Sequence, residues 1–180
     1  SDRADIVDLG TGQLSYLSNL LDPRVAAMAA FVPSESTVYV FGGHDGTGTP
    51  QDDIYAVSLR SGITRRLDDA ALSTPLHSGA AVYHPGLNRI YIFGGHDGSL
   101  SSGAIHRFDP TTETIVELTT QLPFALADVG AAYSGATGHI YLFGGWAFAG
   151  TSEIYDITLN ADGTIGNIVD IPGVNLPEAT

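Results

Sequence analysis

A repeat of about fifty residues constrains the fold of this chain more than any other feature of its sequence. Three short runs of β-branched and aromatic residues, at 38–41, 90–93 and 140–143, have the composition of β-strands. Each run ends in a pair of glycines, and these pairs are Gly42 and Gly43, Gly94 and Gly95, and Gly144 and Gly145. A period of this length indicates a repeat architecture, in which each repeat is one supersecondary unit.

Three further strand-like segments accompany each run. A small-residue segment precedes it at 29–31, 80–82 and 131–133. One strand follows at 53–57, 104–108 and 153–157, and another follows a tight turn at 63–67, 114–118 and 165–171. We name these four strands a, b, c and d in chain order. The N-terminus fits the same register, because 4–9 resembles strand c and 13–17 resembles strand d.

Four-stranded antiparallel units with this period are typical of β-propeller blades. The segments FGGHDG at 41–46 and 93–98 resemble the best-known part of the kelch repeat, and the third copy reads FGGW at 143–146. The resemblance implies an all-β, kelch-like propeller segment with four-stranded antiparallel blades. The predicted division is a c–d hairpin over 1–21, blades over 22–70, 71–121 and 122–173, and the start of a further blade over 174–180.

The number of blades predicts an incomplete ring. The kelch resemblance implies roughly six or seven blades, and this chain supplies about half of them. The apolar faces at the two ends of such a fan would be exposed without neighbours. We therefore expect the remaining blades to come from the same gene, another fragment or another copy.

The six paired glycines have a structural interpretation. Glycine allows backbone angles and close approaches that a Cβ would block, and strand b must leave the sheet beside the crowded inner strand. A phosphate-binding interpretation is disfavoured, because no strand–loop–helix context follows the doublets.

The loops between strands b and c provide the first candidate site residues. In propellers of this kind, the b–c loops (44–52, 96–102 and 146–152) and the d–a loops (68–77 and 122–128) gather at one mouth of the central channel. His44 and Asp45 match His96 and Asp97 on the next repeat, and these types bind metals or polar ligands. The alternative is a local turn in which the aspartate bonds the backbone. The third repeat lacks both residues, so we predict no metal site.

Trp146 and Phe148 are the strongest candidates for contact with a partner. They are two aromatic residues in the small-residue loop GWAFAG at 145–150. Such residues stack on sugar rings or anchor protein partners. The alternative is packing against the adjacent blade.

Composition narrows the classes of partner. The chain has 20 acidic and 7 basic residues and a formal net charge of −13, which disfavours nucleic acids and anionic membranes. No apolar stretch is long enough for membrane insertion. Cysteine is absent, which excludes disulfides and thiol chemistry. Strong acidity without cysteine leans toward an extracellular or cell-surface protein.

Catalytic motifs are missing from the sequence. It contains neither a Gly-x-Ser-x-Gly elbow nor a His-Glu-x-x-His motif, and we predict no catalytic residue and no cofactor. The predicted function is a non-catalytic protein- or glycan-binding scaffold module. The first alternative is an enzyme domain, such as a sugar epimerase or hydrolase, with its site at the channel mouth. The second is a structural component of an extracellular assembly.

Overall fold

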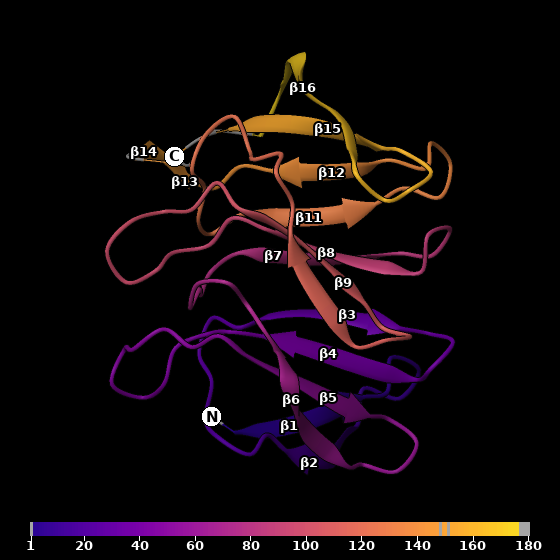
Figure 1. The fold of residues 1–180 in the computed structure, drawn as a ribbon. Helices are drawn as coiled ribbons and strands as arrows, with labels where there is room; N and C mark the ends of the chain where they lie inside the picture. Colours follow the sequence, from indigo (N-terminus) through magenta and orange to yellow (C-terminus); the bar gives the residue numbers. More distant parts are fainter. Residues whose placement is uncertain (1, 148, 151, 177–180) are drawn as a thin grey trace.

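The predicted strands form antiparallel sheets in the computed structural model, which describes residues 2–147, 149–150 and 152–176 (Figure 1). Three of these sheets have four strands each, ordered along the chain as a, b, c and d. They are stacked one upon another like the blades of an open fan (Figure 1). The predicted all-β fold with four-stranded blades in an incomplete ring is confirmed. The described part of the chain contains no helix with the length and hydropathy needed to span a bilayer.

The strands follow the repeat in order. The half-blade at the N-terminus pairs β1 (Arg3–Val7) with β2 (Leu14–Asn19). The first blade contains β3 (Met28–Val32), β4 (Thr37–Phe41), β5 (Asp53–Ser58) and β6 (Thr64–Ala71). The second contains β7 (Ala80–His84), β8 (Arg89–Phe93), β9 (Ile105–Asp109) and β10 (Thr114–Glu117). The third contains β11 (Gly130–Tyr133), β12 (Ile140–Phe143), β15 (Glu153–Leu159) and β16 (Ile165–Asn175), and its b–c loop carries β13 (Trp146–Ala147) and β14 (Ala149–Gly150).

Strand d is longer than predicted in two blades. In the first blade, β6 continues to Ala71, so residues 68–71 belong to the sheet and not to the d–a loop. A register shift between Asp53 and Tyr55 gives β6 the extra residues that allow it to pair again at Asp53. In the third blade, β16 likewise continues to Asn175 after a register shift opposite Glu153 and Tyr155.

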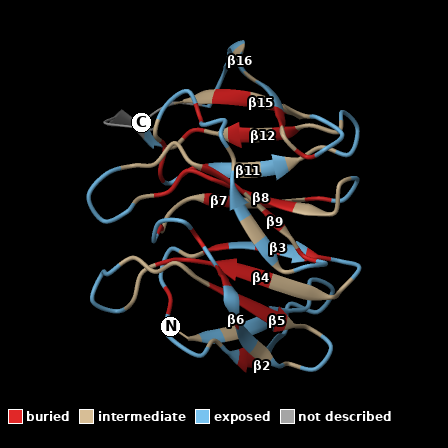
Figure 2. Cartoon of the chain, viewed as in Figure 1, coloured by how far each residue is buried: buried red, intermediate tan, exposed pale blue. Residues whose placement is uncertain are grey.

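Both faces of the second blade are buried against neighbours. Side chains alternate between the two faces of a strand. On β8, Ile90 and Ile92 pack in the core shared with the first blade, while Tyr91 and Phe93 pack in the core shared with the third. All four are fully buried, and Figure 2 shows β8 buried between its neighbours. This alternation explains why strand b is a continuous apolar run.

Polar contacts align successive blades at the outside and at the hub. The Tyr91 hydroxyl donates to the carbonyl of Gly163, in the c–d turn of the third blade, at 2.9 Å. At the hub, the Ser78 N–H donates to the Ala26 carbonyl at 2.8 Å, and the Asp128 N–H donates to the Ser78 carbonyl at 2.6 Å. These three residues occupy equivalent positions, and all have φ between 51° and 58°. At Ser78 and Asp128, the left-handed backbone thus directs the N–H to a carbonyl of the preceding hub loop.

The first glycine of each of the first two doublets lies against the loop that enters the next blade. A Cβ on Gly42 would lie 2.2 Å from the Leu76 carbonyl oxygen, and one on Gly94 would lie 2.2 Å from that of Leu126. Both glycines also have positive φ. Because the obstacle is backbone, no side-chain rearrangement can relieve it.

We expect Gly94→Ala to lower the free energy of unfolding by about 2–4 kcal/mol, through clash and backbone strain together. Gly138→Ala is the matched control, because Gly138 also has a positive φ (75°) but nothing lies within 4 Å of its added Cβ. The control should lose only about 1–2 kcal/mol. Urea denaturation measures both values, and equal losses in the two variants would show that interblade contact at Gly94 is unimportant.

His106 is a buried titratable group at the contact between β9 and the loop that precedes the second blade. Its Nε2 lies 2.8 Å from the Ser73 hydroxyl, which itself donates to Glu117. The hydroxyl therefore accepts from Nε2–H. Within the described residues, Nδ1 has no hydrogen-bond partner. Burial lowers the pKa of His106 below its ordinary value of 6.5, and the nearby Glu117 carboxylate only partly opposes this effect.

This arrangement predicts acid sensitivity. Below pH 6.5 the unfolded chain binds a proton at His106 more readily than the folded chain does. The free energy of unfolding should therefore decrease as the pH is lowered. The slope from this one group is at most about 1.4 kcal/mol per pH unit. His106→Gln keeps a donor toward Ser73 and should reduce the slope between pH 7.5 and 5. Urea titrations of the two proteins test this expectation, and an identical slope in the variant would refute it.

Candidate functional site

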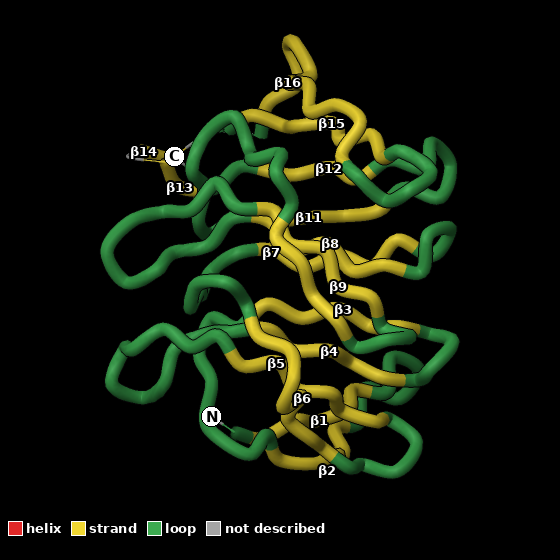
Figure 3. The backbone as a smooth tube through the Cα atoms, viewed as in Figure 1, coloured by secondary structure: helices red, strands yellow, loops and turns green. Residues whose placement is uncertain are grey.

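The b–c and d–a loops of each blade are joined by the same backbone pairing. His44 pairs with Val25, His96 with His77, and Trp146 with Ala127. Each pair exchanges two N–H to carbonyl bonds of 2.7–3.0 Å. In Figure 3 the long loops lie together at the left of the blades. The pairing fixes the backbone from which the side chains at this mouth project.

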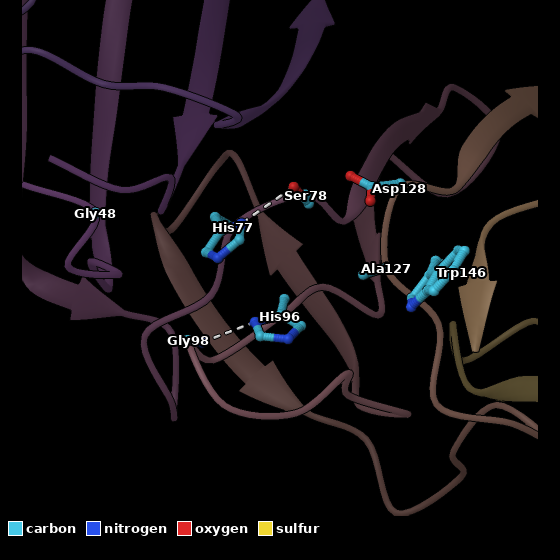
Figure 4. A pocket seen from close by; sticks show the side chains of 8 residues that line it. All are labelled: Gly48, His77, Ser78, His96, Gly98, Ala127, Asp128 and Trp146. Atoms are coloured by element: carbon cyan, nitrogen blue, oxygen red, sulfur yellow. Dashed lines mark hydrogen bonds between the residues drawn. The ribbon is translucent and has the colours of Figure 1, made fainter. Parts of the chain in front are cut away.

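A pocket of about 240 Å³ opens between the second and third blades at the mouth. Figure 4 shows His77, His96 and Ser78 on the side of the second blade, and Asp128 and Trp146 on the side of the third. Gly48, Gly98 and Ala127 complete its lining.

Trp146 and His96, two of the residues predicted from sequence, line this pocket together. Trp146 is 53% exposed although its backbone is fixed by Ala127. Phe148, the second aromatic residue predicted in the same loop, lies outside the described residues.

Three histidine rings form a row across the mouth. The ring centroids of His44 and His77 are 5.2 Å apart, and those of His77 and His96 are 5.3 Å apart. His44 is therefore in contact with the pocket wall, although it does not line the pocket. Burial lowers the pKa of His77, and repulsion from the two flanking imidazoles adds to this effect, while Asp128 and Asp97 oppose it.

The hydrogen bonds assign the protons on the outer two rings. His44 Nδ1 faces the Asp45 carbonyl at 2.8 Å, and a carbonyl only accepts, so this nitrogen donates. His96 Nδ1 accepts from the Gly98 N–H at 2.9 Å, which leaves the ring proton on Nε2 in the neutral form.

Asp45 and Asp97 organise their own loops. Asp45 Oδ1 accepts hydrogen bonds from Thr47 and Thr49, and Asp97 Oδ1 accepts from the backbone of Ser99 and Leu100. These bonds hold the pKa of both carboxyl groups below the usual range. Neither aspartate lines the pocket, so the local turn is the role that the geometry favours.

The sequence did not single out His77, Ser78 and Asp128. Its only signal was that the d–a loops were expected at the mouth. At the position of Asp128 the other blades have Ser78 and Ala26, and at the position of His77 they have Val25 and Ala127. Because no residue type repeats at these positions, comparison between repeats could not mark them.

The pocket also contains a hydroxyl–imidazole pair. The Ser78 hydroxyl lies 3.0 Å from His77 Nδ1. In the part of the chain that the structure describes, no carboxylate hydrogen-bonds to the other nitrogen of His77, so the pair lacks the group that orients a catalytic base. The positive φ of Ser78 recurs at Ala26, which points to hub architecture and not to a strained nucleophile. The described residues contain no group of three or more His, Asp or Glu arranged to hold a metal ion.

Comparison with known families agrees with this architecture. The chain matches the model of the KLHDC2/KLHL20/DRC7 Kelch-repeats domain over residues 5–162, and the resemblance predicted from 41–46 and 93–98 is confirmed. No curated protein matches the chain significantly. Since the family model spans far more than half of the sequence, from the half-blade into the third blade, the chain belongs to the Kelch-repeat family.

Proposed function

We propose that this domain binds a protein partner at the mouth pocket and that Trp146 is the anchor of the interface. Kelch-repeat domains generally mediate protein–protein interaction, which supports a non-catalytic binding module. The observation that carries the proposal is the exposed Trp146 side chain beside a pocket of about 240 Å³. A partly exposed indole on a fixed backbone is typical of residues that dominate binding energy.

Three alternatives remain distinct from this proposal. A glycan would stack a sugar ring on the same indole and hydrogen-bond to Asp128. An epimerase or hydrolase would need an acid and a base converging on substrate, and Asp128 with His77 are the groups that the pocket offers. Among the described residues, no carboxylate hydrogen-bonds to the His77 ring, which favours binding over catalysis. A purely structural part of an extracellular assembly would leave the mouth without a ligand.

A selection from a random displayed peptide library on the immobilised chain tests the proposal. We expect the enriched peptides to lose at least about thirtyfold in affinity for Trp146→Ala, because a buried aromatic anchor contributes about 2 kcal/mol or more. Tyr16→Ala is the matched control, because Tyr16 is an aromatic residue of similar exposure (58%) on β2. Circular dichroism confirms that both variants fold.

Three outcomes would overturn the proposal. Peptides that bind Trp146→Ala as tightly as the original chain would move the interface elsewhere. A library without enriched peptides, together with Trp146-dependent binding on a glycan array, would establish the glycan alternative. The absence of Trp146-dependent binding in both assays would favour a structural role.

We also propose that the two ends of the fan pack against further blades, from the same gene, another fragment or another copy. At one end, an apolar pocket of about 360 Å³ beside β1 is lined by Val38, Val40 and Val57. At the other, Tyr141 and Phe143 on β12 are only half-buried, whereas their counterparts in the second blade are fully buried. These faces continue the pattern of the cores between blades.

If this is correct, the 180-residue chain should self-associate through its end faces. Light scattering should give an average mass above 18.8 kDa that rises with concentration. Tyr141→Glu should reduce the association, while Val116→Glu on the outer strand β10 should not. A stable particle of 18.8 kDa at every concentration would contradict the proposal.

A further inference from the structure

We propose that the mouth pocket selects a cationic side chain of the partner, an arginine or a lysine, and holds it between the Asp128 carboxylate and the Trp146 indole. This inference rests on the proposed protein-binding function and specifies which chemistry the pocket recognises. Three observations support it: the Asp128 carboxylate has no partner among the described residues, backbone hydrogen bonds hold Asp128 and Trp146 in place, and the opposite wall of the pocket is lined by no arginine or lysine.

Asp128 has a charge that no neighbour neutralises. It is exposed, and among the described residues its carboxylate makes no hydrogen bond or ion pair. Three other aspartates in the mouth loops already accept hydrogen bonds within the chain. Asp45 and Asp97 accept hydrogen bonds within their own turns, and Asp22 accepts one from the Tyr55 hydroxyl. Asp128 is therefore the pocket-lining carboxylate that is available to a ligand.

The backbone holds Asp128 and Trp146 beside each other. The Asp128 N–H donates to the Ser78 carbonyl at 2.6 Å, and the preceding residue, Ala127, exchanges two backbone hydrogen bonds with Trp146. Figure 4 shows both side chains on the same wall of the pocket. An indole face attracts a cation, and an arginine fork also matches a carboxylate. The two groups therefore suit the same ligand atoms.

Among the residues that the structure describes, the opposite wall is lined by no arginine or lysine that would repel such a ligand. His96 Nδ1 accepts the Gly98 N–H, and burial together with the two neighbouring imidazoles lowers the pKa of His77. The one arginine in the mouth loops, Arg24, has a buried side chain whose Nη2 lies 2.6 Å from Asp53. With aspartates at 22, 45, 52, 97 and 128, the loops produce a negative field that steers cations toward the mouth.

Trp146 is the only tryptophan of the chain, so its indole N–H gives one identifiable NMR signal. We would titrate the chain at pH 7.5 and low salt with N-acetyl-arginine methylamide. N-acetyl-citrulline methylamide, which has nearly the same shape without the charge, and N-acetyl-glutamate methylamide are the comparison probes. The arginine derivative should shift the Trp146 signal, and the citrulline derivative should bind about fivefold more weakly, as expected for a loss of about 1 kcal/mol.

Asp128→Asn should reduce arginine binding to the citrulline level. Asp162→Asn is the control, because it removes an equal charge at an exposed turn in the third blade, outside the pocket, while an asparagine keeps the hydrogen bonds to Thr164. Arginine binding should be unchanged in this control and should weaken on addition of salt.

Equal binding of arginine and citrulline, no shift with any probe, or an Asp128→Asn variant that binds like the original chain would overturn the inference. Preference for glutamate would overturn it as well. The library selection separates this failure from failure of the proposed function. Selected peptides that depend on Trp146 but contain no arginine or lysine leave protein binding standing and refute only the cationic specificity.

Discussion

Close packing of one blade on the next is the constraint on which the rest of this structure depends. Each complete blade is too thin to have a core of its own, so its apolar side chains are buried only between sheets. Along β8, Ile90 and Ile92 point into the core shared with the first blade, and Tyr91 and Phe93 point into the core shared with the third. One strand therefore contributes to two cores. The Gly94 backbone must touch the Leu126 carbonyl for the second and third blades to approach this closely.

The same packing creates the mouth pocket. Because the d–a loops that enter the second and third blades hydrogen-bond to the preceding hub loop, the side chains of neighbouring blades meet around the mouth. The backbone geometry at Ala26, Ser78 and Asp128 is shared, while the side chains differ. The backbone contacts that hold the blades together need no particular side chain at these positions. The side chains there can therefore vary to suit a ligand without loss of stability. The pocket thus combines imidazoles from the second blade with a carboxylate and an indole from the third.

Much of the fold was predictable from the sequence. Runs of β-branched and aromatic residues, glycine pairs and tight turns are local signals, and they correctly predicted four strands in each of three repeats. The extension of β6 to Ala71 was not predictable, because a register shift depends on how β5 and β6 pair and leaves no local mark. Two residues of the site, Trp146 and His96, could be predicted in the same way, because each directly follows a glycine doublet.

By itself, the sequence determined the repeat, the strands and the class of fold, because these follow from the spacing of apolar residues and glycines along the chain. Only the tertiary structure decided that Asp97 serves its own turn while Asp128 faces the pocket, although both are exposed aspartates in loops. It also brought His77 into contact with both His44 and His96. The reason is physical: these relations depend on contacts between loops of different blades, and such contacts are fixed only when the blades pack.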